Sequence, residues 1–171
     1  MKELEKLIRD VPDFPKEGII FKDITTLLQN AEGWKTTIDA MVDKCRGMRI
    51  DKVLGIEARG FAVAGPVAYI LNAGFILARK PGKLPARTRR MEYSLEYGTA
   101  TIEVHEDAIE PGERILILDD LLATGGTVEA AAKLVESLGG KVAGIGFIIE
   151  LAFLNGRDKV ADYPCFSLIT V

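Results

Sequence analysis

Residues 115–127 read ILILDDLLATGGT, and this stretch decides the fold. The apolar run Arg114–Leu118 has the continuous hydrophobic character of a strand that is buried on both faces. Two carboxylates, Asp119 and Asp120, follow it directly, and a short glycine-containing loop leads into a helical pattern over Thr127–Leu138. In open α/β sheets, ligands bind at the carboxyl edge of the strands. The stretch therefore predicts a strand, a ligand-binding loop and a helix.

Similar apolar runs recur on both sides of this stretch. Strands are predicted at Lys52–Glu57, Phe75–Ala78, Val142–Ile149 and Phe166–Val171. Helices are predicted at Trp34–Met48 and Gly60–Leu71. Strands that alternate with helices imply right-handed crossovers. We therefore expect an α/β fold with a mostly parallel central sheet flanked by helices.

The first 30 residues do not show this alternation of strands and helices. Residues 2–10 space their apolar side chains as a helix does, and Asp23 is placed to cap a second short helix over Ile24–Leu28. We expect residues 1–30 to form a small cap over the sheet, within a single domain that spans residues 1–171.

A second departure lies before the central stretch. Tyr93–Tyr97 and Thr99–His105 alternate in polarity around Gly98, which predicts an antiparallel hairpin. The segment from Lys80 to Tyr97 is rich in glycine, proline and charge, so we expect a flexible loop that closes during a reaction.

Composition excludes several classes of protein. The chain has 171 residues, 48% hydrophobic and 27% charged, with a formal net charge of -3, so no basic footprint for nucleic acid is present. No run approaches the roughly 20 apolar residues of a membrane span. Cys45 and Cys165 form no CxxC pair, which fits a reducing cytoplasm. The single histidine, His105, excludes a histidine-rich metal site, and its strand-like surroundings argue against a catalytic base.

The loop Ala123–Thr127 has the features of a phosphate site. Its glycines allow the backbone to approach an anion, and the following helix start favours negative charge. The Thr124 and Thr127 hydroxyls add hydrogen-bond donors. Each feature alone is also typical of an exposed turn or a plain helix start. Carboxylates on one side and a phosphate loop on the other favour a phosphorylated sugar.

The order of strand, DD, three residues and TGGT resembles the phosphoribosyl pyrophosphate (PRPP) signature of the type I phosphoribosyltransferases. The resemblance implies that Asp119 and Asp120 hold the ribose hydroxyls. It implies that the 5-phosphate is held by Ala123, Thr124, Gly125, Gly126 and Thr127. Mg²⁺ would arrive with PRPP rather than in a dedicated protein site, since this ion usually binds substrate phosphates with few protein ligands.

Further segments resemble the adenine-specific branch of that family, and they cover nearly the whole chain in order. They are DFPKEGIIFKD at residues 13–23, EARG at residues 57–60 and YSLEYG at residues 93–98. The resemblance implies transfer of a 5-phosphoribosyl group from PRPP to adenine, which yields AMP and pyrophosphate in purine salvage. It also implies a homodimer.

The resemblance assigns four residues to the base pocket. Ile20, Phe21 and Lys22 would line it, Phe21 would stack on the ring, and Leu151 would cover the opposite face. Phe21 could instead be a core aromatic, and Leu151 could simply end an apolar strand. Family members often carry arginine where Lys22 stands, which leaves base preference open if that contact is made by the side chain.

Pyrophosphate would be held by cations. The resemblance points to Arg59, Lys80 and Lys83, and to Arg79 acting across a dimer interface. Arginine suits Arg59's position because its planar fork matches phosphate oxygens. The alternative for Arg59 is a surface ion pair with Glu57. Three further arginines depart from the family and are interpreted as a solvated loop face: Arg87, Arg89 and Arg90.

The adenine ring loses a proton as it is alkylated, so a general base is needed. The resemblance points to Glu96, with Tyr97 beside it; together with Arg59 these are the expected catalytic residues. Glu96 could also be an ordinary exposed strand residue.

Two other functions remain open at this point. One is a PRPP-sensing regulatory protein without catalysis, which the acidic composition and the presence of Glu96 disfavour. The other is a transferase for xanthine, hypoxanthine or orotate, which the cap segment and YSLEYG disfavour.

Overall fold

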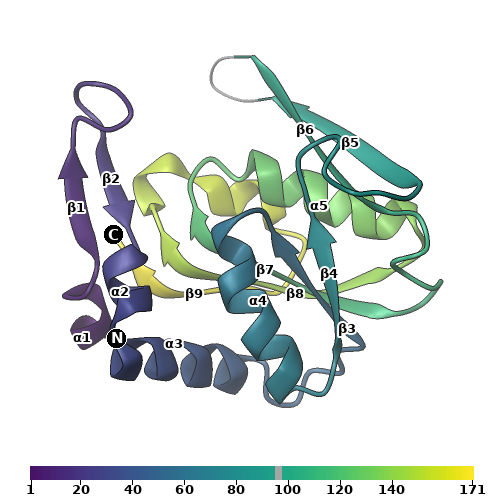
Figure 1. Ribbon diagram of the computed structural model, residues 1–171, viewed down its shortest axis with the longest axis horizontal. Helices are drawn as coiled ribbons and strands as arrows, with labels where there is room; N and C mark the ends of the chain where they lie inside the picture. Colours follow the sequence, from purple (N-terminus) through teal and green to yellow (C-terminus); the bar gives the residue numbers. More distant parts are fainter. Residues whose placement is uncertain (95–97) are drawn as a thin grey trace.

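In the computed structural model, which describes residues 1–94 and 98–171, a five-stranded parallel sheet forms the centre of the fold (Figure 1). Its strand order is β4-β3-β7-β8-β9. In sequence order the strands are β3 (Lys52–Ile56), β4 (Gly74–Ala78), β7 (Arg114–Leu122), β8 (Lys141–Glu150) and β9 (Cys165–Thr170). The predicted α/β architecture is therefore confirmed, with all five strands parallel.

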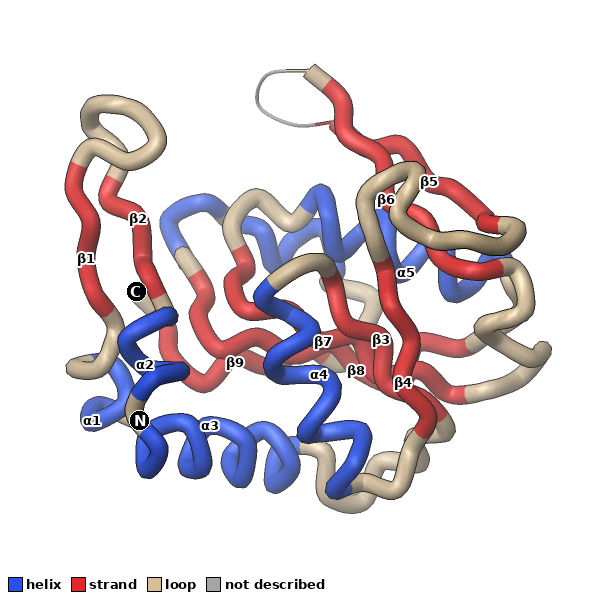
Figure 2. Tube along the Cα trace, viewed as in Figure 1, coloured by secondary structure: helices blue, strands red, loops and turns tan. Residues whose placement is uncertain are grey.

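Helices cover both faces of this sheet (Figure 2). They are α3 (Ala31–Lys44) and α4 (Arg59–Ile70) on one face and α5 (Gly126–Ser137) on the other. Along β7, Ile117 packs with α5, whereas its neighbours Leu116 and Leu118 pack with α4. Successive side chains of a strand point to opposite faces, so burial of both faces explains the continuous apolar run.

The N-terminal segment differs from the single helix predicted over residues 2–10. Helix α1 spans only Lys2–Glu5, and β1 (Arg9–Pro12) pairs antiparallel with β2 (Ile20–Asp23). A helix this short gains little from its own hydrogen bonds, and pairing with β2 satisfies the backbone of the next residues instead. The short helix α2 (Thr25–Gln29) follows, close to its predicted place.

The predicted hairpin is present, but it begins earlier than its sequence pattern indicated. Strand β5 (Thr88–Ser94) pairs antiparallel with β6 (Thr99–His105). Arg89 and Arg90 therefore lie on a strand, and their assignment to a loop was wrong. Arg90 forms a cross-strand ion pair within this hairpin. Its Nε lies 3.0 Å from a carboxylate oxygen of Glu103, a side chain only 1% exposed. A buried carboxylate requires such a partner.

The two-stranded ribbons β1–β2 and β5–β6 stand apart from the sheet on either side of the loops that follow β3 and β7 (Figure 1). Those loops lie at the carboxyl edge of the sheet, where the sequence predicts the ligand. The fold therefore frames this edge with two projecting ribbons.

Asp23 joins the N-terminal ribbon to α2, and its pKa gives a test of this junction. Its carboxylate accepts from the Thr25 backbone N–H at 2.9 Å and from Arg9 Nε at 3.1 Å. The Arg9 hydrogen bond, helped by that of Thr25, lowers the pKa of Asp23 from 3.8 to about 2.

We expect Asp23→Asn to lower the free energy of unfolding at pH 7 by about 1 kcal/mol, since the ion pair is lost. Because folding lowers this pKa, the stabilisation is complete above pH 3.8 and is lost as pH falls toward 2. Urea denaturation at pH 7 and pH 3 should therefore show a difference that shrinks in acid. Asp43→Asn, which breaks an exposed pair with Arg46, is the control. A pH-independent difference would contradict the assignment.

Candidate active site

The carboxylate pair lies at the end of β7, which runs four residues beyond its predicted end at Leu118. Asp120 is 7% exposed, and its Oδ2 lies 2.6 Å from Nε of Arg59, the first residue of α4. The alternative ion pair of Arg59 with Glu57 was wrong, because Glu57 binds Arg79 instead. The structure thus brings together an acid and a cation that are 61 residues apart in the sequence.

Asp119 occupies a more confined position beside Asp120. Its Oδ1 accepts from the Asp120 backbone N–H at 2.8 Å, and a Cβ added at Gly60 would lie 2.8 Å from the same oxygen. Glycine at the start of α4 therefore allows this helix to approach the acid closely. Desolvation in this position raises the pKa of Asp119 well above its ordinary value, and repulsion from the Asp120 carboxylate raises it further. The folded protein therefore disfavours the ionised form of Asp119.

The loop after β7 leads directly into α5. Gly125 precedes the helix with a φ of 81°, a left-handed conformation that favours glycine, and the helix begins at Gly126, one residue earlier than predicted. A pocket of about 70 Å³ is lined by the loop residues 123–127, with Asp119 and Phe147 at its sides. A helix start with a small pocket next to carboxylates is the arrangement predicted for a phosphorylated sugar.

The predicted base-pocket residues lie on β2 and directly after β8. Phe21, on β2, has the Arg59 guanidinium 5.4 Å from its ring centroid, and it lies outside both buried core clusters. Ile20 is 59% exposed, while Lys22 forms an ion pair with Asp10 on β1 at 2.7 Å. Leu151 is half-buried after β8 and donates its backbone N–H to Leu122 O at 2.9 Å. Arg59 therefore connects the ribbon that carries Phe21 to the carboxylate pair.

The basic segment begins directly after β4. Arg79 Nε lies 3.1 Å from Glu57 Oε2, and its Nη1 donates to the Lys83 carbonyl at 3.3 Å. The Lys80 backbone N–H donates to Glu57 at 3.0 Å, while the side chains of Lys80 and Lys83 are exposed. Glu57 therefore anchors the start of this segment beside Arg59. Sequence reasoning considered Glu57 only as a partner of Arg59 and missed this role.

Two predicted catalytic residues, Glu96 and Tyr97, lie outside the described residues. Their neighbour Ser94 is described, and its carbonyl oxygen would lie 3.1 Å from a Cβ added at Gly126. The end of β5 therefore contacts the start of α5, at the phosphate loop.

Sequence reasoning also missed Gly156. A Cβ added at Gly125 would lie 2.4 Å from the Gly156 carbonyl oxygen, and one added at Gly156 would lie 2.1 Å from the Ala123 carbonyl oxygen. The two backbones therefore pack directly against each other, which only glycine at both positions allows. The Asn155-Gly156 pair signalled a turn in the sequence, but nothing in the pattern indicated which loop it would contact.

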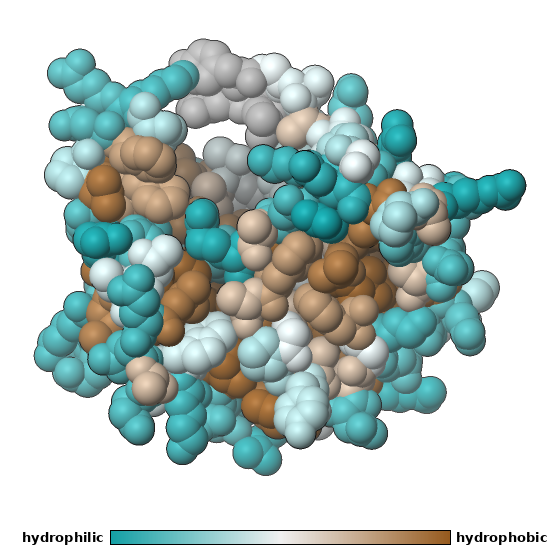
Figure 3. All heavy atoms as spheres, viewed as in Figure 1, coloured by the Kyte–Doolittle hydropathy of each residue, from teal (hydrophilic) through white to brown (hydrophobic). Residues whose placement is uncertain are grey.

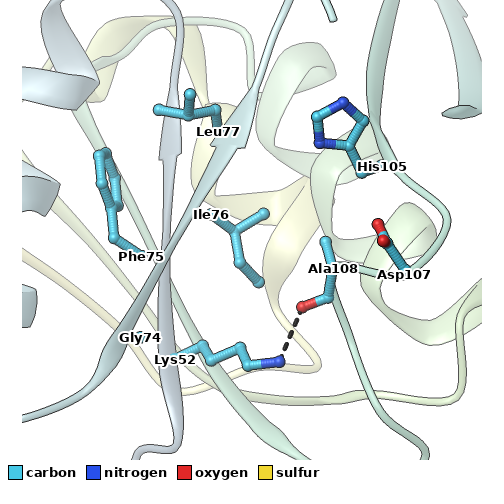
Figure 4. A pocket seen from close by; sticks show the side chains of 8 residues that line it. All are labelled: Lys52, Gly74, Phe75, Ile76, Leu77, His105, Asp107 and Ala108. Atoms are coloured by element: carbon cyan, nitrogen blue, oxygen red, sulfur yellow. Dashed lines mark hydrogen bonds between the residues drawn. The ribbon is translucent and has the colours of Figure 1, made fainter. Parts of the chain in front are cut away.

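A different cavity, of about 340 Å³, lies beside the edge strand β4 (Figure 4). It contains His105 and Lys52, whose Nζ donates to the Ala108 carbonyl at 2.9 Å. Lys52 and Gly74 begin β3 and β4, so much of the lining comes from the end of the sheet opposite to the carboxylate pair. Separately, none of the helices in residues 1–94 and 98–171 is long and apolar enough to span a membrane.

Comparisons with known proteins agree with this geometry. Residues 23–170 match the phosphoribosyl transferase domain family. The adenine phosphoribosyltransferase of Acidobacterium capsulatum is 59% identical over 166 residues, which cover 97% of this chain and 92% of the relative.

Solved structures extend the similarity to three dimensions. Adenine phosphoribosyltransferase from Thermoanaerobacter pseudethanolicus has a TM-score of 0.97 at 51% identity, covering 99% of both chains. The Saccharomyces cerevisiae protein, solved with D-2,5-dideoxy-2,5-imino-altritol 1,6-bisphosphate and adenine, has a TM-score of 0.92 at 37% identity, covering 98% of this chain and 97% of that one. The chain therefore belongs to the phosphoribosyl transferase domain family, within its adenine phosphoribosyltransferases.

Proposed function

We propose that this protein transfers the 5-phosphoribosyl group of PRPP to adenine, with AMP and pyrophosphate as products. One observation carries the proposal: the carboxylate pair Asp119–Asp120 stands beside a glycine-lined helix start, with Arg59 held on Asp120 at 2.6 Å. The identity of the base follows from the relatives, since the yeast protein was solved with adenine. Adenine salvage is the purpose that this reaction serves.

Each part of PRPP has a matching group at this edge of the sheet. Asp119 and Asp120 would accept hydrogen bonds from the ribose hydroxyls. The backbone and hydroxyls of the loop would bind the 5-phosphate, through Ala123, Thr124, Gly125, Gly126 and Thr127. Pyrophosphate would lie toward Arg59, with Lys80, Lys83 and Arg79 adding positive charge. Catalysis would rest on holding these groups in place and on neutralising the leaving group.

Mg²⁺ would enter as part of the substrate, bound to PRPP. Among residues 1–94 and 98–171, no three side chains of the usual metal-binding types lie close enough to hold an ion. The carboxylate pair fits the chemistry, because Mg²⁺ combines one or two protein carboxylates with phosphate oxygens. When bound, the ion would neutralise charge on the departing pyrophosphate.

The base would bind between the N-terminal ribbon and the end of β8. Phe21 would stack on adenine, Ile20 and the backbone of Lys22 would line its edge, and Leu151 would cover the other face. A backbone contact for Lys22 is supported by the ion pair of its side chain with Asp10 at 2.7 Å. Glu96, beside Tyr97, would accept the ring proton.

The chain would work as one domain, residues 1–171, in the cytoplasm. Leu4 and Ile24 of the cap are buried in the same cluster as the sheet residue Leu116, which supports a single domain. The cysteines, Cys45 and Cys165, are free thiols, as a reducing compartment would keep them.

A homodimer is supported by the apolar surface over α4 and β4, part of which is visible in Figure 3. Its exposed members are Tyr69 (87%), Ile70 (49%), Phe75 (43%) and Leu77 (38%). Phe75 and Leu77 lie on an edge strand, and exposed apolar edges are usually covered by a partner. Arg79 follows the same strand directly, so it would reach the partner's pyrophosphate site.

The reaction is tested with a panel of bases. Purified protein, PRPP and Mg²⁺ are incubated separately with adenine, hypoxanthine, guanine, xanthine and orotate, and nucleotides are separated by chromatography. We expect AMP from adenine alone, and no product with EDTA, because PRPP needs its metal. Product from another base would overturn the base pocket. PRPP binding without product from any base would favour a regulatory protein.

We expect the substitution Asp119→Asn to increase stability while it decreases activity. The amide oxygen can still accept from Asp120, while removal of a charge in this confined position should raise the melting temperature wherever Asp119 is ionised in the folded protein. Because folding raises the pKa of Asp119, the ionised form is destabilising above that pKa, and the difference between the two proteins should shrink as pH falls below it. We expect AMP formation to fall on the order of 100-fold. A variant that melts below wild type at every pH of a titration series would contradict this account.

Subunit complementation tests the role of Arg79. We expect Arg79→Ala and Asp119→Asn to be nearly inactive alone. Unfolded and refolded together, they should recover about a quarter of wild-type activity, because half of the dimers are mixed and one site in each is intact. No recovery, with a dimer shown by light scattering, would place Arg79 in its own subunit's site.

A further inference from the structure

A cluster of polar side chains lies behind the phosphate loop, outside the groups assigned above. Glu150 ends β8 and is 7% exposed, which is unusual for a carboxylate. Arg157 Nε donates to Glu150 Oε1 at 2.8 Å, and its Nη2 binds the other oxygen, so the pair is bidentate. The Ser167 hydroxyl, on β9, donates to Glu150 Oε2 at 2.7 Å. We call these three residues the β8–β9 cluster.

Arg157 also fastens this cluster to the neighbouring strand. Its Nη1 donates to the Cys165 carbonyl at 2.8 Å, and its Nη2 lies 3.1 Å from Ser167 Oγ. The guanidinium therefore contacts the last residue of β8 and the first half of β9 at the same time. The Arg157 hydrogen bond also lowers the pKa of Glu150, so the pair stays ionised at neutral pH.

The segment that this cluster holds runs from Leu151 to Arg157 and contacts two parts of the site. At one end, the Leu151 backbone N–H donates to Leu122 O at 2.9 Å, directly before the phosphate loop. At the other end, Gly156 packs against Ala123 and Gly125, with a gap too small for a methyl group at either glycine. The side chain of Arg157, the next residue, links Gly156 to Glu150 on β8 and to the Cys165 carbonyl on β9.

We infer that the β8–β9 cluster positions the 151–157 segment, and that this segment sets the phosphate loop and the base wall together. Arg157, Glu150 and Ser167 are positioning residues here, since they act through Gly156 and Leu151. The inference rests on the proposed function for the identity of the ligands. Loss of the fork should let Gly156 move, and Gly125 would lose the surface against which it is packed.

The test uses Arg157→Met, which keeps the length of the side chain, and Glu150→Gln, which keeps the shape of the partner. We expect each to raise the dissociation constant of PRPP, measured by calorimetry, about tenfold, since small misplacements weaken such sites strongly. The KM for adenine should rise with it, because Leu151 belongs to the same segment. Arg157→Lys, which keeps the charge but not the fork, should recover part of the loss.

Lys52→Met is the matched control. It removes a partly buried ion pair with Glu113, at 2.8 Å, at the opposite end of the sheet. It should lower the melting temperature and leave PRPP affinity and both KM values unchanged. If Arg157→Met and Glu150→Gln behave in the same way, the cluster is purely structural and the inference is wrong.

The inference can still be tested if Arg157→Met does not fold or if the proposed function fails. If Arg157→Met does not fold, Ser167→Ala, which removes one hydroxyl from the cluster, decides by the same PRPP measurement: unchanged affinity overturns the inference. If wild-type protein binds PRPP but forms no AMP, the proposed function fails, and the PRPP affinities of the variants still test the cluster.

Discussion

The ion pair between Arg59 and Asp120 is the interaction on which the rest of the site depends. It joins the end of β7 to the start of α4, and Arg59 also reaches Phe21 on the N-terminal ribbon. Three separate elements thereby meet at one guanidinium. Asp119 lies beside this pair in a confined position that raises its pKa. The fold therefore places two carboxylates next to each other, although their mutual repulsion is unfavourable. Such a concentration of like charge is typical of a binding site rather than of a stabilising one.

Much of this arrangement could be predicted from the sequence. The run from Ile115 to Thr127 contains its strand, its acids and its glycine loop in order, and a buried parallel strand has an unmistakable apolar pattern. The parallel sheet and the hairpin followed from similar local patterns. Resemblance to a known family then supplied the class of reaction, and the comparisons confirm that family.

What could not be predicted depends on contacts between distant residues. The partner of Arg59 is 61 residues away, and nothing local distinguishes Asp120 from Glu57, which is two residues away. Residues 2–10 had a helical spacing, yet pairing with β2 made a strand that begins at Arg9. Gly156 looked like a turn residue, and its contact with Gly125 depends on how two loops pack. The observed ends of several elements differ from the predicted ends for the same reason, since pairing with neighbouring strands decides where a strand stops.

The Arg59–Asp120 pair has a consequence for which molecules the site can retain. A phosphate that binds Arg59 competes with Asp120 for the guanidinium, and Asp120 is a carboxylate only 7% exposed that depends on this counter-charge. A ligand that carries only phosphate weakens the pairing of this buried acid, which is unfavourable. A ligand that also brings hydroxyl groups supplies the acid with new hydrogen-bond donors. The closed pair therefore favours ligands that carry phosphate and hydroxyl groups on one molecule, as a sugar phosphate does.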